Sequence, residues 1–159
     1  YWELFADLEK AAAGGYMKAQ KRVAVMYADG VGGKKDLEAA ARWYEKAAEQ
    51  GDVFSQTRLA GMYYNGSGVA KEPAKAARWY QAAARQGNVT AQYNLAVIYF
   101  NGRGMPEDPV KSYAWMTLAA TQGQSQASEQ LDILRQKMSE DEIKTAESLF
   151  DELYQQVLM

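Results

Sequence analysis

Few side chains in this sequence could perform nucleophilic or acid–base chemistry. Its 159 residues include no histidine and no cysteine, which excludes Ser-His triads, thiol nucleophiles and zinc sites built from Cys and His. A serine nucleophile of the S-x-x-K type needs a lysine three positions later, and none of the seven serines has one. Carboxylates, lysines and tyrosines remain, but no spacing forces any pair of them together. The sequence therefore predicts a protein that is not an enzyme and that uses neither a metal nor another cofactor.

A glycine-rich segment resembles a phosphate-binding loop in composition only. Gly30, Gly32 and Gly33 precede Lys34, whereas a phosphate loop needs the order G-x-x-x-x-G-K-[ST] after a strand. We therefore interpret these glycines as turn residues with backbone conformations that other residues avoid. The charge is nearly balanced, since 18 Lys and Arg against 20 Asp and Glu give −2. The chain thus lacks the cationic excess of a general nucleic-acid or membrane-surface binder.

The elements that would position any site are expected to be helices. Alanine, the strongest helix former, occurs 27 times, and proline only three times. Hydrophobic residues make up 48% of the chain, which is enough to bury a core. No uninterrupted apolar run reaches the ~18 to 20 residues that a membrane-spanning helix needs, so membrane insertion is not expected. The length fits one domain or one array of repeats.

An internal repeat of 36 residues organises the sequence. Gly51, Gly87 and Gly123 are separated by this interval, and no insertion lies between the copies. Further columns that recur at the same interval are Trp43, Trp79 and Trp115; Tyr27, Tyr63 and Tyr99; Gln20, Gln56 and Gln92; Gln50, Gln86 and Gln122; and Ala24, Ala60 and Ala96. We interpret the repeated tryptophans and tyrosines as core residues, because large rings fill the gaps between small alanines.

Each copy carries the signals of two helices. In the second copy the first helix is expected over residues 52–64, and Gly66 follows it as a left-handed cap. An acidic residue followed by proline, Glu72-Pro73, marks the start of the second helix, which is expected to stop at Gly87. The repeat therefore predicts pairs of helices joined by a glycine-containing loop.

The two ends of the chain depart from the repeat. Residues 1–14 fit a lone second helix. Ser139 and Glu142 form a capping box that opens a last helix to about Leu158, and this helix is expected to cover the exposed apolar face of the array. We expect a single domain that consists of a partial repeat at 1–14, full repeats at 15–51, 52–87 and 88–123, and a degenerate repeat with a capping helix at 124–159.

The repeated residues resemble the Sel-one-like repeat (SLR) family, a relative of the tetratricopeptide repeat. The family pattern is A-x-x-x-L-G-x-x-Y-x-x-G-x-G-V-x-x-D-x-x-K-A-x-x-W-Y-x-K-A-A-x-x-G. The second copy supplies the run from Leu59 to Val69, then Lys75-Ala76, Trp79-Tyr80, Ala83-Ala84 and Gly87. The glycine of the first helix is an alanine in all three copies, and both residues are small enough for close helix packing. The resemblance implies an all-α fold, a right-handed α-solenoid of antiparallel helix pairs with a C-terminal capping helix.

In tetratricopeptide-like folds the first helix of each pair lines the inner, concave surface. The register then assigns to this groove a set of positions that the repeat leaves variable. They are Lys21, Val25, Phe54, Thr57, Tyr64, Asn65, Tyr93, Val97, Phe100, Asn101, Glu129 and Ile133. A contiguous exposed patch of apolar and aromatic side chains is usually a binding site. The alternative is that some of these rings pack between neighbouring first helices.

The resemblance implies a non-enzymatic protein-interaction module, an adaptor or regulator that binds a peptide or a partner domain in its groove. Two alternatives stay open: an immunity or inhibitor protein that neutralises a secreted bacterial effector, and a β-lactam-binding enzyme. The expected partner is a protein or peptide, without nucleic acid or membrane insertion, and the oligomeric state is open. The family resemblance and the start at Tyr1, without an initiator Met, favour a periplasmic or exported bacterial protein over a cytoplasmic one.

Overall fold

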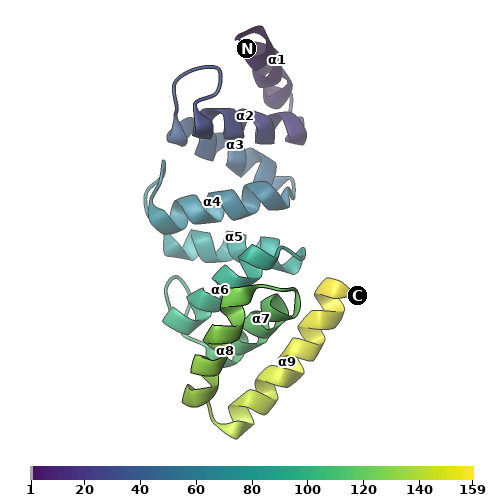
Figure 1. The fold of residues 1–159 in the computed structure, drawn as a ribbon. Coiled ribbons are helices and arrows are strands. Elements are labelled where there is room, and N and C mark those ends of the chain that lie inside the picture. The colour runs from purple at the N-terminus through teal and green to yellow at the C-terminus, as the bar shows by residue number, and fades with distance from the viewer. Residues whose placement is uncertain (1) are drawn as a thin grey trace. The chain divides into compact units, whose positions relative to one another are not determined.

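The fold is entirely helical over residues 2–159, the part of the chain that a computed structural model describes (Figure 1). Tyr1, the first residue of the expected partial repeat, lies outside the described residues. Within them no helix combines the length and the apolar character that crossing a membrane requires. The helices are α1 (Trp2–Ala13), α2 (Met17–Asp29), α3 (Leu37–Glu49), α4 (Val53–Asn65), α5 (Pro73–Arg85), α6 (Val89–Asn101), α7 (Pro109–Thr121), α8 (Ser125–Lys137) and α9 (Glu140–Leu158).

The helix ends confirm the signals seen in the sequence. Gly66 caps α4 in the left-handed conformation, with φ of 72°, and its N–H donates to the carbonyl of Met62. At the start of α9 the N–H of Glu142 donates to Oγ of Ser139 at 3.1 Å. The N–H of Ser139 donates to the Glu142 carboxylate at 3.0 Å. The capping box therefore satisfies two N–H groups that the helix itself leaves unpaired.

The loop between the two helices of a repeat is closed in the same way in each copy. A backbone N–H at the end of the loop donates to the carbonyl of the repeated tyrosine. These bonds, each 2.9 Å long, join Asp36 to Tyr27, Glu72 to Tyr63 and Asp108 to Tyr99. Gly68 lies in the second of these loops with φ of +76°, and a Cβ added there would lie 2.5 Å from the carbonyl oxygen of Leu37. Only glycine therefore allows this loop to approach α3 so closely.

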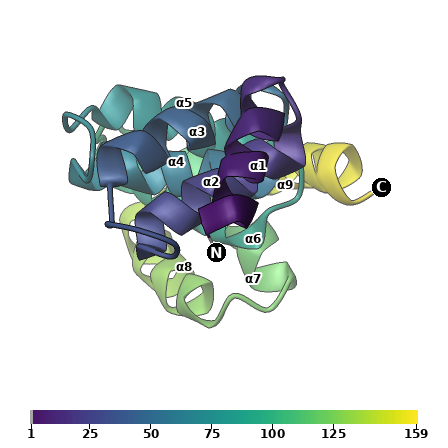
Figure 2. The same cartoon turned by 90° about the horizontal axis from the view of Figure 1, so that it is seen from above.

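The helices form two compact units, one up to Trp79 and one from Tyr80, and α5 runs through the boundary. In the first unit α2 packs against α1 and α3, and α3 also packs against α4. Figure 2 shows α2 and α3 side by side. In the second unit α7 packs against α6, α8 and α9. Each unit thus has the construction of an α-solenoid, in which consecutive helix pairs pack on their neighbours.

Small residues dominate the core. The alanines that replace the family glycine, Ala24, Ala60 and Ala96, are fully buried, so the two helices of a repeat pack closely as expected. The repeated rings differ in burial: Trp115, Tyr63 and Tyr99 are buried, whereas Trp43, Trp79 and Tyr27 are half-buried. The ammonium of Lys46 lies 4.6 Å from the centre of the Trp43 ring, so part of this ring faces a surface cation. The core interpretation therefore holds fully for some rings and in part for others.

Repeated glutamines link neighbouring helices inside each unit. In the first unit, Nε2 of Gln20 donates to the carbonyl of Ala12 at 3.1 Å and Nε2 of Gln56 donates to the carbonyl of Ala48 at 3.1 Å. In the second unit, Nε2 of Gln92 donates at 3.2 Å to the carbonyl of Ala84, near the end of α5. Gln20, Gln56 and Gln92 are all buried. Each of these carbonyls lies at a helix C-terminus and also accepts from the N–H of the following glycine, Gly15, Gly51 or Gly87. The glutamine amide adds a second hydrogen bond that comes from the next helix.

Candidate functional site

The residues expected to line the groove lie on four helices, and none of them is buried. Phe54, Asn65, Asn101, Glu129 and Ile133 are exposed, and the other seven are half-buried. In the first unit α2 carries Lys21 and Val25, and α4 carries Phe54, Thr57, Tyr64 and Asn65. In the second unit α6 carries Tyr93, Val97, Phe100 and Asn101, and α8 carries Glu129 and Ile133. Each of these twelve side chains therefore has part of its surface accessible to solvent.

Phe54 is the most exposed aromatic side chain of this set, with 39% of its surface accessible. The ammonium of Lys21 lies 5.0 Å from the centre of its ring, and the guanidinium of Arg58 lies 5.4 Å from it. The ring also packs at 6.3 Å from the ring of Tyr44, which is buried beneath it. Cation–π contacts of this kind contribute about 0.5–1 kcal/mol each at exposed sites. They hold two positive groups beside an accessible aromatic ring.

A cavity of about 490 Å³ opens on α2 next to this ring system. Val25 and Met26 form its apolar lining, and Lys18, Lys21 and Arg22 provide its charged lining. We call Lys18, Lys21, Arg22 and Arg58, together with Phe54, the cationic face. The positive charge is concentrated here although the chain as a whole carries −2.

Arg22 and Arg58 are not among the site residues predicted from the sequence. Both occupy the same column of the repeat, because they are 36 positions apart, and that column lies directly after the one assigned to the groove. Arginine recurs at this column in two successive copies, and this recurrence is the sequence signal by which the two residues could have been found. Both arginines are exposed, so their charges reach the surface that Phe54 occupies.

The carboxylate of Asp52 lies beside the cationic face. Asp52 lies 3.8 Å from the Lys21 ammonium, but its side chain also accepts from the N–H of Ser55 at 2.9 Å as the cap of α4.

The buried Tyr44 lies under the Phe54 ring. Burial raises the pKa of Tyr44, the charge of Arg58 opposes this rise, and the charge of Asp29 adds to it. The Tyr44 hydroxyl therefore stays neutral at physiological pH and adds no negative charge to the cationic face.

In the second unit, Phe100 has a structural role beside its exposed edge. It packs against a cluster formed by Tyr113, Leu134, Met138 and Ala146. The ammonium of Lys137 lies 4.9 Å from the centre of its ring. For Phe100, packing between helices accounts for part of its surface, in line with the alternative left open by the sequence. Phe54 is thus the more accessible anchor.

The ionisable side chains of these surfaces are carboxylates, lysines, arginines and tyrosines. Among residues 2–159, no group of three or more Asp or Glu side chains is placed to hold a metal ion. Burial is the largest cause that raises the pKa of Tyr63 and of Tyr99, which keeps both hydroxyls protonated. What the cationic face offers is positive charge, an accessible ring and an apolar cavity.

The sequence matches a family model described as Sel1 repeat over residues 18–52, 53–88 and 89–124. No curated protein matches the chain. Among solved structures, the chain resembles a protective antigen of uropathogenic Escherichia coli with an SLR fold, at 29% identity and a TM-score of 0.83. It also resembles a Sel1 repeat protein from Oxalobacter formigenes, at 27% identity and a TM-score of 0.72.

The chain spans only part of each of these proteins. The match to the antigen covers 96% of this chain and 32% of the antigen. The match to the Oxalobacter protein covers 84% of this chain and 60% of that protein.

Proposed function

Because the chain belongs to the Sel1 repeat family, we propose that it binds a partner protein through the first helices of its repeats. Membership confirms the resemblance seen in the sequence. Sel1 repeat proteins are generally protein-interaction modules, and their fold is generally a non-catalytic scaffold. The proposal goes further in assigning the contact to the residues expected to line the groove and to the cationic face.

One observation carries the proposal: Phe54 is exposed while two cations are held beside its ring. An aromatic side chain that is both accessible and fixed by its neighbours loses little conformational entropy when a partner covers it. Aromatic and arginine side chains are also the residue types that contribute most to binding energy at interfaces. The adjacent cavity with Val25 and Met26 offers room for an apolar side chain of the partner.

The positive charge of the cationic face favours a partner with negative charge. Lys18, Lys21 and Arg22 surround an apolar cavity, and Arg58 adds a fourth positive group beside Phe54. A segment with Asp or Glu residues around one leucine or similar side chain would meet both features. Complementary charge raises the association rate and excludes basic competitors. We therefore propose an acidic protein segment as the ligand of the cationic face.

Binding of a short fluorescein-labelled peptide, with acidic residues around one leucine, tests this proposal by fluorescence anisotropy. The variant Lys18→Gln/Lys21→Gln/Arg22→Gln should weaken binding about tenfold, because three rim charges each contribute a fraction of a kcal/mol. The matched control is Lys10→Gln/Lys34→Gln/Lys35→Gln, which removes three exposed positive charges elsewhere in the same unit.

A second peptide, with Asn and Gln in place of the acids, measures the part of the affinity that charge supplies. Equal losses in the two triple variants would show that the peptide responds only to net charge, which would contradict the assigned face. Preferential binding of a labelled single-stranded oligonucleotide by the same four cations would also contradict it.

A further inference from the structure

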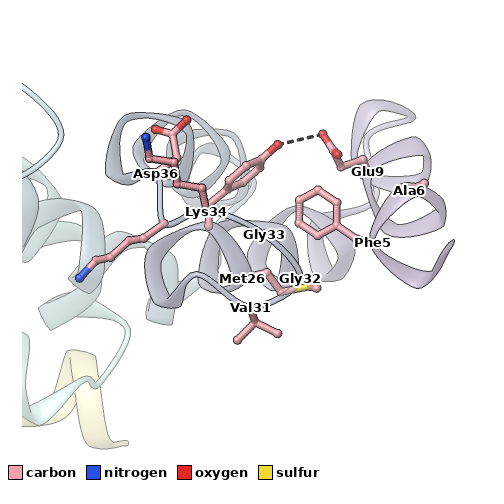
Figure 3. A pocket seen from close by; sticks show the side chains of 11 residues that line it. Phe5, Ala6, Glu9, Met26, Val31, Gly32, Gly33, Lys34 and Asp36 are labelled. Carbon is pink, nitrogen blue, oxygen red and sulfur yellow. Dashed lines mark hydrogen bonds between the residues drawn. The ribbon is translucent and has the colours of Figure 1, made fainter. Parts of the chain in front are cut away.

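A cavity of about 760 Å³ lies between α1 and the loop 30–36 (Figure 3). Phe5 and Glu9 extend from α1 toward the loop. The Phe5 ring lies close to Gly32, since a Cβ added there would lie 3.7 Å from the ring and 3.5 Å from the Met26 side chain. The lining also includes Tyr27, whose hydroxyl donates to the Glu9 carboxylate at 3.2 Å. Met26 also lines the cavity beside the cationic face, but the other residues do not belong to the surface proposed above, so this cavity needs a separate explanation.

The aromatic rings of this cavity form a corner. The rings of Phe5 and Tyr27 have their centres 5.2 Å apart and are inclined by 84°. The Glu9 carboxylate is held beside them by the Tyr27 hydroxyl. Burial is the largest cause that raises the pKa of Tyr27, the charge of Glu9 adds to it and the charge of Arg42 opposes it, so the hydroxyl remains a donor to the carboxylate. Aromatic rings at right angles with a carboxylate nearby are the features that bind organic ammonium groups.

In the other two repeats a lysine lies over the equivalent tyrosine ring. In the second repeat the ammonium of Lys75 lies 5.2 Å from the centre of the Tyr63 ring. In the third repeat the ammonium of Lys111 lies 5.6 Å from the centre of the Tyr99 ring. The column that holds these lysines contains Ala39 in the first repeat. No cation of the described residues lies over the Tyr27 ring in the way that the two lysines cover theirs.

The volume of the cavity also differs between the first and the second repeat. In the second repeat the equivalent cavity, lined by Ala41, Glu45, Tyr63 and Gly68 among others, measures about 300 Å³. The residues at the corresponding positions of the first repeat are Phe5, Glu9, Tyr27 and Gly32. The first repeat therefore combines a larger cavity and an additional ring with the loss of the lysine.

We propose that the cavity between α1 and the loop 30–36 binds an organic ammonium group in the place that Lys75 and Lys111 take in their own repeats. The ammonium would lie against the rings of Phe5 and Tyr27 and close to the Glu9 carboxylate. A free amine or quaternary ammonium compound and a lysine side chain of a peptide share this chemistry. The proposal is independent of the binding proposed for the cationic face, since the two sites share no charged residue.

The other charged groups of the cavity define how tightly it can bind. Asp36 adds a carboxylate, but its side chain also accepts from the N–H of Ala39 at 3.0 Å as the cap of α3. Lys34 and Lys35 also line the cavity, and both are exposed. Their positive charges oppose a cation across solvent, so we expect millimolar affinity. Removal of these two charges should therefore strengthen binding, although an unspecific loss of structure would weaken it.

Titration of the protein with choline, followed by the NMR signals of the tyrosine rings, tests the proposal. The control ligand is 3,3-dimethyl-1-butanol, which has the shape of choline without its charge. We expect the protein to bind choline and not the alcohol. Tyr27→Leu and Glu9→Gln should each weaken choline binding about threefold to fivefold, whereas Lys34→Gln/Lys35→Gln should strengthen it. Absence of choline-selective binding, or choline binding unchanged in both single variants, would overturn the proposal.

The repeat itself supplies a second variant. Ala39→Lys introduces the lysine that the other repeats carry, and Ala39→Met introduces a side chain of similar length without the charge. The backbone tolerates lysine there, since Asp108 caps the N–H of Lys111 at 3.0 Å just as Asp36 caps that of Ala39. Ala39→Lys should abolish choline binding more completely than Ala39→Met does. Equal binding in Ala39→Lys and the unaltered protein would contradict the assignment.

A peptide with one lysine, compared with the same peptide carrying norleucine, distinguishes the two sources of the ammonium group. Competition of the lysine peptide with choline would identify a lysine side chain as a ligand of this site. Choline binding without such competition would identify a small cation as the ligand.

Discussion

The side-chain amide of Gln122 donates to the side-chain oxygen of Gln92 at 2.6 Å. Gln92 is fully buried and donates in turn to the carbonyl of Ala84 at 3.2 Å. The same chain of bonds occurs in the first unit, where Gln50 donates to Gln20 at 2.7 Å. A buried amide that both donates and accepts thus connects the end of one helix pair to the next pair. Two columns of the repeat, which in sequence are merely recurrent glutamines, form one network in the structure.

Replacement of Gln92 should therefore destabilise the second unit. Gln92→Leu keeps the volume but removes the donor to the Ala84 carbonyl and the acceptor for Gln122. The Ala84 carbonyl still accepts from the N–H of Gly87, and Gln122 still donates to the carbonyl of Leu118, so the variant loses two hydrogen bonds of about 0.5–1.5 kcal/mol each. We expect a loss of about 2 kcal/mol in the free energy of unfolding, measured with urea. Gln136→Leu, an exposed position on α8, should change stability by less than about 0.5 kcal/mol. Similar losses in both variants would contradict the role of the network.

Two glycines separate the cost of backbone conformation from the cost of close contact. Gly51 has φ of +97° and a Cβ added there would meet no atom within 4 Å. Gly68 has φ of +76° and a Cβ there would lie 2.5 Å from the Leu37 carbonyl oxygen. We expect Gly51→Ala to cost about 1 kcal/mol and Gly68→Ala about 2 kcal/mol more, because the loop must move away from α3. Denaturant unfolding of the two variants measures the difference, and equal costs would refute the close approach.

The capping box at α9 provides a test of a feature read directly from the sequence. Ser139→Ala removes the acceptor for the N–H of Glu142 and should lower the free energy of unfolding by about 1 kcal/mol. Ser139→Asp keeps an acceptor at the N-cap and should restore most of this loss. Thermal unfolding followed by circular dichroism compares the three proteins. If alanine and aspartate destabilise to the same extent, the hydrogen bond does not contribute.

The helices follow from local signals, whereas the sites depend on contacts between copies. Gly66 and Ser139 are end signals that act within a few residues, so the sequence alone predicts where α4 ends and where α9 begins. That some groove rings pack between helices was an open alternative, but the sequence did not single out Phe100, because its burial depends on Leu134 and Met138 in the part of the chain that departs from the repeat. The proposed site at Tyr27 rests on the replacement of a lysine by Ala39 in the first repeat. The sequence alone does not show that this lysine lies over a tyrosine ring, as Lys75 lies over Tyr63 in the structure.

A buried tyrosine should make the free energy of unfolding depend on pH in the alkaline range. Burial, the largest cause, raises the pKa of Tyr44 above its ordinary value of 10.0. In the unfolded chain this group loses its proton near pH 10, while in the folded protein it still holds it, so unfolding releases a proton in that range. The contribution of Tyr44 to stability should be constant below pH 10 and fall as the pH rises above it toward the folded pKa. Tyr44→Phe should reduce this fall, whereas Tyr16→Phe, at a position 71% exposed, is the matched control. An identical pH dependence in all three proteins would contradict the assignment.

Phe54 allows the ring to be tested separately from the charges around it. Phe54→Ala removes the accessible ring but leaves Lys21 and Arg58, so affinity for the acidic leucine peptide should fall about tenfold, by loss of apolar contact and of the fixed geometry of the two cations. Phe54→Trp should retain most of the affinity, since a larger ring binds cations at least as well. Because the side chain is 39% exposed, its loss should lower the melting temperature less than a core substitution such as Leu59→Ala. Anisotropy titrations and thermal unfolding of the same samples measure both effects, and an unchanged affinity in Phe54→Ala would move the binding site away from α4.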